Sequence, residues 1–251
     1  KLENNFPRLF TRTLILTLLL HHYPSDNKNF VRDFVAGIAD DDELKHVYEG
    51  FTRSLHNIVD SHNTYLPGSQ RLIPFYEELL VTFWKVMSTN KHLRVYICKD
   101  TDISKVLVPL LFILQTQSKE PSKFPVVQMS SFTLLLLSGH REFGVALNRP
   151  YDIKAPLELP SFSGTFADLL IIALCKTISS DKGLMRPLYD CLLTIVANIS
   201  PYTKTLSMIS SLKLVNLFEA FASAKVLYTS DKSPQFVQLL LETFNNLIQY
   251  Q

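Results

Sequence analysis

The feature that most constrains the fold of this chain is a helical spacing of apolar residues. Its clearest example runs from Leu188 to Ile199, where apolar side chains fall at offsets 0, 3, 4, 7, 8 and 11. A helix of about 3.6 residues per turn places these positions on one face. Pro187 comes just before them, and proline is favoured in the first turn of a helix because its missing N–H has no partner there. We therefore expect a helix that begins at Pro187 and buries one side.

The same spacing recurs along the chain and predicts about ten helices in all. Acidic residues at 40–42 and 77–78 lie where negative charge favours the positive end of a helix, and Pro74 is expected in a first turn. The 44–59 segment should form about four turns. The other expected helices lie at residues 8–22, 29–39, 74–87, 102–118, 126–137, 165–178, 205–221 and 236–248.

We interpret this pattern as an all-α fold in which short links join consecutive helices. Only 7 of the 251 residues are glycine, and neither Asn-Gly nor Asp-Gly occurs, which argues against a turn-rich β fold. The helices are too apolar to stand alone, so neighbours must stack, as in a HEAT/armadillo-like helical-repeat array (an α-solenoid). We expect residues 1–251 to form a single such segment. Because no strict repeat period is found, a compact irregular helical domain is the alternative.

Composition narrows the functional classes. A chain that is 47% hydrophobic and 19% charged is not predominantly disordered, and its net charge of +2 gives no field that would draw it to nucleic acid. The apolar runs at 14–20 and 169–175 are too short for a membrane-spanning helix of about 20 residues. The chain begins at Lys1 without a signal-peptide pattern, and we expect a fragment of a longer polypeptide that continues past Gln251.

Signatures of catalysis and cofactor binding are absent from the sequence. It contains no GxxxxGK[ST], GxGxxG, GxSxG, HExxH or CxxC, so we predict no enzyme activity, cofactor, metal site or small-molecule substrate. Cys98, Cys175 and Cys191 are predicted to be reduced core residues in a reducing compartment. Two alternatives stay open: an enzyme whose site assembles from distant residues, and a lipid-binding module that uses the basic and aromatic residues at 91–96.

Several polar residues that could suggest a site are interpreted as structural. Thr165 and Asp168 have the spacing of a capping box, which satisfies free N–H groups at a helix start. A solvated turn is expected at SGHRE (138–142), where Gly139 follows an apolar run. Amides expected to bond to neighbouring helices are Asn198, Asn245 and Asn246, and His21 and His22 are expected to cap a helix end.

One connection, residues 148–163, is long and rich in proline. Pro150, Pro156 and Pro160 exclude a helix there, so its backbone groups must bond to water, to the helices or to a partner. Long loops on a rigid scaffold often bind partners, although packing against the scaffold is an equal alternative. Because arginine and tyrosine often supply interface energy, the residues predicted to bind a protein partner are Arg149, Tyr151, Asp152 and Lys154.

Four stretches of the chain resemble a known family. They are LLLLSGHREFGVALNRPYD, FSGTFADLLI, YDCLLTIVANISPYTKTLSM and LLETFNNLIQYQ, within a likeness that covers about residues 72–251 and weakens before them. They resemble the high-temperature-induced dauer-formation family, which is distantly similar to dymeclin. The strongest block lies at 143–151 and enters the proline-rich loop.

That resemblance implies a function that the residue patterns alone do not predict. It implies a large cytosolic protein, peripheral on Golgi and trans-Golgi membranes, that supports sorting of neuropeptide and hormone cargo into dense-core vesicles. The family's myristoylation signal has no Met-Gly counterpart here, so the membrane anchor is expected outside this segment. The expected partners are proteins of the sorting machinery, and the family offers no catalytic residues to carry over.

Overall fold

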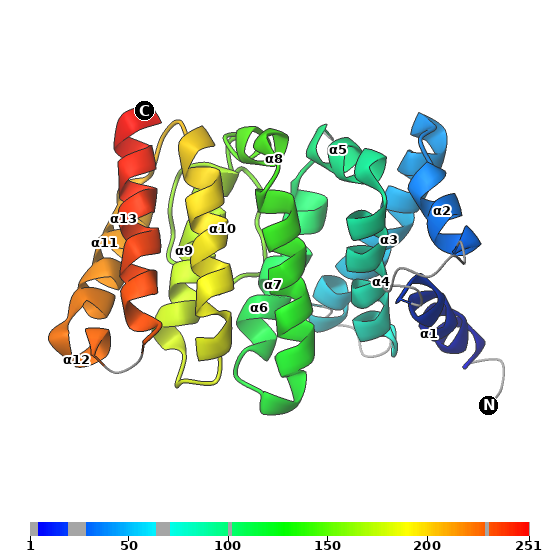
Figure 1. Ribbon diagram of the computed structural model, residues 1–251, viewed down its shortest axis with the longest axis horizontal. Helices are drawn as coiled ribbons and strands as arrows, with labels where there is room; N and C mark the ends of the chain where they lie inside the picture. The colour runs from blue at the N-terminus through cyan, green and yellow to red at the C-terminus, as the bar shows by residue number, and fades with distance from the viewer. Residues whose placement is uncertain (1–4, 20–28, 64–70, 100–101, 229–230, 251) are drawn as a thin grey trace. The chain divides into compact units, whose positions relative to one another are not determined.

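The computed structural model describes residues 5–19, 29–63, 71–99, 102–228 and 231–250, and these form helices joined by loops (Figure 1). Strands are absent from these ranges; an isolated antiparallel bridge joins Pro150 to Thr165. None of the helices in the described ranges has both the length and the apolar character needed to cross a membrane. The chain divides into two compact units, residues 1–100 and 101–251, which are described separately.

In unit 1, helix α4 packs against all four other helices. Its buried side chains include Leu80, Phe83 and Met87. Two contacts secure its ends: Glu78 pairs with arginines of α1, and the Asn90 amide donates to the carbonyl oxygens at the end of α2 at 2.7 and 2.8 Å. The helices are α1 (Phe6–Leu19), α2 (Phe30–Gly37), α3 (Asp41–Asn63), α4 (Tyr76–Thr89) and α5 (Lys91–Lys99).

Unit 2 contains three helix pairs, α6–α7, α9–α10 and α11–α13 (Figure 1). Helix α6 contacts α9 and α9 contacts α11, while α7 contacts α10 and α10 contacts α13. Twelve of the fifteen residues of α9 are buried, as suits a helix that is apolar on every side. The α-helices are α6 (Ser104–Gln117), α7 (Phe124–Ser138), α8 (Arg141–Ala146), α9 (Phe166–Ser180), α10 (Tyr189–Ile199), α11 (Met208–Ala222), α12 (Ala224–Leu227) and α13 (Ser233–Tyr250), and the 3-10 helices are η1 (Pro121–Lys123), η2 (Arg186–Leu188) and η3 (Ser200–Tyr202).

The predicted all-α fold is confirmed, and each predicted segment contains a helix. The prediction of about four turns at 44–59 was too short, because α3 has 23 residues. Pro187 lies in the 3-10 turn η2 and Pro74 lies two residues before α4, so neither opens its α-helix. The expected turn at SGHRE is present only at Gly139 and His140, because α7 ends at Ser138 and α8 begins at Arg141. Helices α5 and α12 were not predicted.

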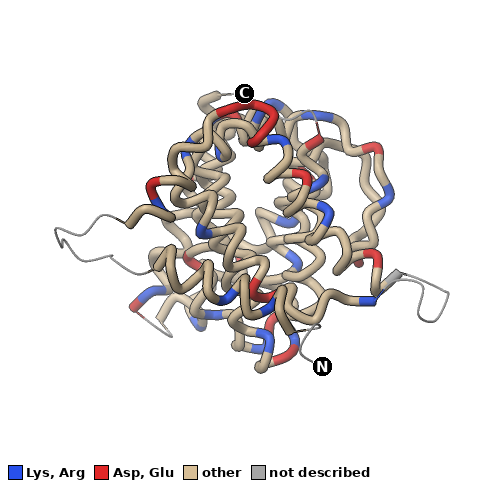
Figure 2. The backbone as a smooth tube through the Cα atoms, turned by 90° about the vertical axis from the view of Figure 1, so that its right-hand side faces the viewer, with Lys and Arg blue, Asp and Glu red and all other residues tan. Residues whose placement is uncertain are grey.

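The structure does not test two other predictions. A repeat array would also divide into neighbouring units, so the two units leave the predicted single segment a prediction. His21 and His22 lie outside the described residues. Figure 2 shows basic and acidic residues intermixed along the backbone, in keeping with the small net charge.

Candidate partner-binding surfaces

The proline-rich loop is closed at its base by backbone hydrogen bonds. Tyr151 N–H donates to the Gly164 carbonyl at 2.9 Å, and Phe166 N–H donates to the Arg149 carbonyl at 3.1 Å. A third bond runs from Ala167 N–H to the carbonyl of Leu147, at 2.9 Å. The loop therefore leaves and rejoins the helices at one point, which limits its freedom even though its prolines prevent a helix.

Tyr151 packs inside the loop. Its ring stacks on Phe162 with centroids 5.2 Å apart and an angle of 6°, and it meets Phe166 edge-on at 5.6 Å. Its hydroxyl oxygen accepts a hydrogen bond from Ala155 N–H at 3.2 Å. These contacts leave Tyr151 half-buried. Of the two alternatives for the loop, partner binding and packing against the helices, Tyr151 therefore fits the second.

The other three predicted partner-binding residues differ in exposure. Asp152 and Lys154 are exposed on the loop, whereas Arg149 is half-buried at its base. Further along, Lys176 of α9 donates to the Glu158 carbonyl and pairs with its carboxylate at 3.7 Å. Partner binding by these residues stays a prediction, and Asp152 and Lys154 are the two whose exposure suits it.

Asp168, at the start of α9, is buried and joins two helix starts. Its Oδ2 accepts from Thr165 N–H at 2.8 Å, which confirms the predicted capping box. Its Oδ1 accepts from Ser207 N–H at 2.7 Å and from the Ser210 hydroxyl at 2.6 Å, so the same carboxylate also holds the start of α11. A Cβ on Gly164 would lie 2.3 Å from Oδ2, so glycine is needed there.

These hydrogen bonds determine the charge state of Asp168. Burial by itself raises the pKa of a carboxyl group, but the bonds from Ser210, Thr165 and Ser207 outweigh it and place the Asp168 pKa below its ordinary value. With a further bond from the Thr165 hydroxyl to Oδ2 at 3.1 Å, all four bonds to the carboxylate come from groups of the protein itself. The arrangement is that of a structural anchor, and the sequence signal at Thr165 identified only half of it.

The family-like block at 143–151 forms a second junction. The Asn148 amide donates to the Tyr202 carbonyl at 2.8 Å, and its oxygen accepts from Lys204 N–H at 2.8 Å. A Cβ on Gly144 would lie 2.6 Å from the Tyr202 ring, so α8 can approach η3 only with glycine there. This block joins α8 to η3, and its contacts are internal.

Two of the three predicted amide contacts between elements are confirmed. Asn198 of α10 donates to the Ser138 hydroxyl of α7, and Asn246 of α13 donates to the Ser200 hydroxyl of η3, both at 3.0 Å. Asn245 is exposed.

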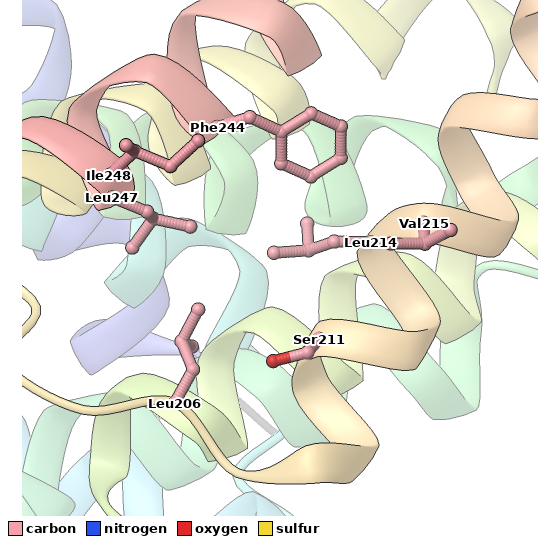
Figure 3. A pocket seen from close by; sticks show the side chains of 7 residues that line it. All are labelled: Leu206, Ser211, Leu214, Val215, Phe244, Leu247 and Ile248. Carbon is pink, nitrogen blue, oxygen red and sulfur yellow. The ribbon is translucent and has the colours of Figure 1, made fainter.

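An apolar groove between α11 and α13 was not predicted (Figure 3). Its volume is about 500 Å³, and Figure 3 shows Phe244 and Leu247 of α13 facing Leu214 of α11 across it. Six of its seven lining residues are apolar: Leu206, Leu214, Val215, Phe244, Leu247 and Ile248, with Ser211 the polar one. A groove without titratable walls suits binding of apolar side chains and offers no acid–base chemistry.

A sequence signal for this groove existed in α13. The apolar stripe predicted within 236–248 consists of Phe236, Leu239, Leu240, Phe244, Leu247 and Ile248 on one face, but the structure divides it. Phe236, Leu240 and Leu247 are buried, whereas Ile248 is 83% exposed on the groove wall. Apolar residues spread around more than one face of a helix indicate packing on more than one side.

Of the basic and apolar residues at 91–96, Lys91, His92 and Val95 are exposed, whereas others make internal contacts. Leu93 of α5 is buried, and Arg94 donates to the carbonyls of Met87 and Ser88 at 2.6 and 3.1 Å. Among the described residues of unit 1, the most exposed aromatic side chains lie on α1 and α2, where the exposed fractions are 61–79% for Phe6, Phe10, Phe30 and Phe34.

Two of the three cysteines have the core positions predicted for them. Cys98 and Cys175 are buried and Cys191 is half-buried, and none of the three forms a disulfide bond. Burial raises the pKa of Cys175 and of Cys191 to about 12, so both are poor nucleophiles at neutral pH. Within the described ranges, no three His, Cys, Asp or Glu residues gather as metal ligands would.

Comparison with known proteins confirms the resemblance. The family model of the high-temperature-induced dauer-formation protein, Hid1, matches residues 12–251. Protein HID1 of Homo sapiens is 42% identical over 228 residues, which are 91% of this chain and 29% of that protein; Protein HID1 of Mus musculus is 41% identical with the same coverage. Protein HID1 of Dictyostelium discoideum is 30% identical over 209 residues, 83% of this chain and 23% of that protein.

No solved structure matches the chain. The chain spans less than a third of the length of these relatives. With a family model matched over residues 12–251 and relatives of 41–42% identity over nine-tenths of its length, the chain belongs to the high-temperature-induced dauer-formation family.

Proposed function

We propose that this chain is a non-enzymatic scaffold segment that supports sorting of neuropeptide and hormone cargo into dense-core vesicles at the Golgi and trans-Golgi network. Membership of the Hid1 family carries this proposal. The segment is held at the cytoplasmic face of the membrane by an anchor outside these residues, and its partners are proteins of the sorting machinery.

The scaffold is an array of stacked helix pairs of the HEAT/armadillo kind. The pairs α6–α7, α9–α10 and α11–α13 support this, because the first helix of each pair contacts the first of the next, and the second contacts the second. Such an array buries a continuous core between its pairs and leaves loops along its sides for partners. The loop at 148–163 is one of them, with Asp152 and Lys154 as its exposed charges.

The non-enzymatic proposal is supported by where the polar groups point. Asp168, the buried carboxylate that could resemble a catalytic base, bonds only to capping groups of α9 and α11. The apolar groove between α11 and α13 has no titratable residue on its walls. An enzyme with a site assembled from distant residues would need convergent acid–base groups around a pocket.

The test uses cells that lack their own Hid1-family protein and receive the full-length protein. Wild type should restore the peptide-hormone content of dense-core vesicles, and Asp152→Ala with Lys154→Ala should restore less while remaining on Golgi membranes. Replacing the exposed residues Lys119 and Glu120 by Ala is the matched control, because it removes the same two charges elsewhere. Failure of wild type to restore hormone content would contradict the sorting role, whereas full restoration by the loop variant would contradict only the loop.

The exposed phenylalanines of unit 1 favour a second candidate, a peripheral lipid-binding module. Phe6 and Phe10 are 68% and 61% exposed on α1, and Phe30 and Phe34 are 79% and 73% exposed on α2. Aromatic side chains of this kind can enter the interface of a bilayer. Flotation of the chain with vesicles, with and without anionic lipid, tests it: binding that is lost when the four residues become Ser supports the lipid module, and absence of binding excludes it.

A further inference from the structure

Helix α11 carries two stripes of apolar side chains, of which one is open. Leu214, Leu217 and Phe221 are buried against the neighbouring helices. A second stripe, Met208, Leu212 and Val215, is spaced by four and three residues and is 86%, 56% and 44% exposed. A helix with apolar residues on two sides is typical of one that packs on two sides.

Helix α13 repeats the same division across the groove. Beside its buried residues it exposes Leu241 and Ile248, 52% and 83% accessible, and places Phe244 between them at helical spacing. Val215 of the open stripe on α11, and Phe244 and Ile248 of the stripe on α13, line the groove (Figure 3). An apolar groove with exposed apolar side chains on both of its helices is typical of a contact surface.

The interior of unit 2 shows what covers such a surface. The pair α9–α10 has the pair α6–α7 on one side and the pair α11–α13 on the other. Accordingly, α9 buries twelve of its fifteen residues, whereas α11, also of fifteen residues, buries only four. The groove is thus a continuation of an established packing surface, and the chemistry that fits it is an apolar face of another helix.

We propose that the α11–α13 groove receives an amphipathic helix from the remainder of a polypeptide of the relatives' length. The matched relatives are more than three times longer than the region they share with this chain, which covers 29% of the human protein. The walls offer one hydroxyl and no charge, so the occupant contributes apolar residues at i, i+3 or i+4, and i+7. The inference rests on the proposed stacking of helix pairs and is independent of the sorting role.

Thiol alkylation compares the groove in the 251-residue chain and in the full-length polypeptide. The probes are Val215→Cys and Ile248→Cys, and Gln238→Cys on the exposed polar side of α13 is the matched control. The native thiols give little background, because Cys98 and Cys175 are buried and Cys191 has a raised pKa. Thermal unfolding of each variant verifies that it is folded before labelling.

The expected result is fast labelling of both probes in the 251-residue chain and labelling at least about tenfold slower in the full-length polypeptide, where the reaction must wait for local opening. The control should react equally fast in both. Equal probe rates in both would overturn the proposal. Slow probe labelling in the 251-residue chain together with a doubled mass in light scattering would also overturn it, by showing that a second copy covers the groove. Neither readout depends on hormone sorting, so failure here is distinguishable from failure of the scaffold function.

Discussion

Helix α11 takes part in two regions that are built in opposite ways. At its start, Ser207 and Ser210 bond to the buried carboxylate of Asp168, whose two oxygens are fully used by the protein. Further along, Val215 forms a wall of a groove whose apolar surface is open. A closed polar junction fixes the geometry of the helices, whereas an open apolar surface can accept another helix. The buried, charged residue is therefore structural here, and the surface available for contact is uncharged.

Asp168→Ala tests the closed region most severely. The change leaves the Ser207 and Thr165 N–H groups and the Ser210 hydroxyl without their acceptor, and a buried polar group without a partner costs about 1–3 kcal/mol each. We expect the free energy of unfolding of unit 2 to fall by about 3–5 kcal/mol, measured by urea denaturation. Asp152→Ala, which removes an exposed carboxylate, is the control and should change it by less than about 0.5 kcal/mol. A loss below 1 kcal/mol at Asp168 would show that water replaces its bonds.

Gly164→Ala tests the same junction through its packing. The added Cβ would lie 2.3 Å from Asp168 Oδ2, so the carboxylate or the loop must move, and we expect a loss of about 2–3 kcal/mol. Gly50→Ala in α3 is the matched control, because nothing lies within 4 Å of its added Cβ and alanine favours the helix by about 1 kcal/mol. Opposite signs in urea denaturation are expected; destabilisation by both changes would contradict the steric explanation.

Tyr151→Ala asks whether the loop belongs with the closed region or the open one. It removes the stack on Phe162 and the edge contact with Phe166, and we expect a loss of about 2 kcal/mol in the free energy of unfolding. Tyr151→Phe keeps both ring contacts and loses only the bond from Ala155 N–H, so its cost should stay below about 1 kcal/mol. If both variants were neutral, the loop would be loosely held and all four predicted residues would be equally available to partners.

The sequence predicted features that depend on residues close together in the chain better than features that depend on residues far apart in it. Local rules were sufficient for the capping box of Thr165 and Asp168 and for each predicted helical segment. They failed at SGHRE, where α8 begins at Arg141 and approaches Tyr202, more than fifty residues away in sequence, through Gly144. The partners of Asp168 at Ser207 and Ser210 are likewise distant in sequence. The groove was missed because periodicity identifies apolar faces without stating which of them a neighbour covers.

The lowered pKa of Asp168 gives the closed region a pH dependence that the groove lacks. A carboxyl whose folded-state pKa lies below its unfolded value adds stability that is fully present above the unfolded pKa and is lost as the pH falls through the folded pKa. We therefore expect the difference in unfolding free energy between wild type and Asp168→Asn to narrow as the pH is lowered below about 4. Urea denaturation between pH 7 and pH 3 measures it, and a difference that widens at low pH would contradict the assigned direction.

Ile248→Ala is expected to have the smallest effect and separates the groove from the core beneath it. Ile248 is 83% exposed and its neighbour Leu247 is 8% exposed, yet both line the groove. In the 251-residue chain, Ile248→Ala should change the free energy of unfolding by less than about 0.5 kcal/mol, because the side chain is already in water. Leu247→Ala should cost about 2–4 kcal/mol, since it leaves a cavity between α13 and its neighbours. In a full-length polypeptide whose next helix fills the groove, Ile248→Ala should approach the cost of a buried position. An equally small effect in the 251-residue chain and in the full-length polypeptide would mean that the Ile248 side chain stays in water in both. The exposed apolar stripe of α13 would then not be a surface on which another helix packs.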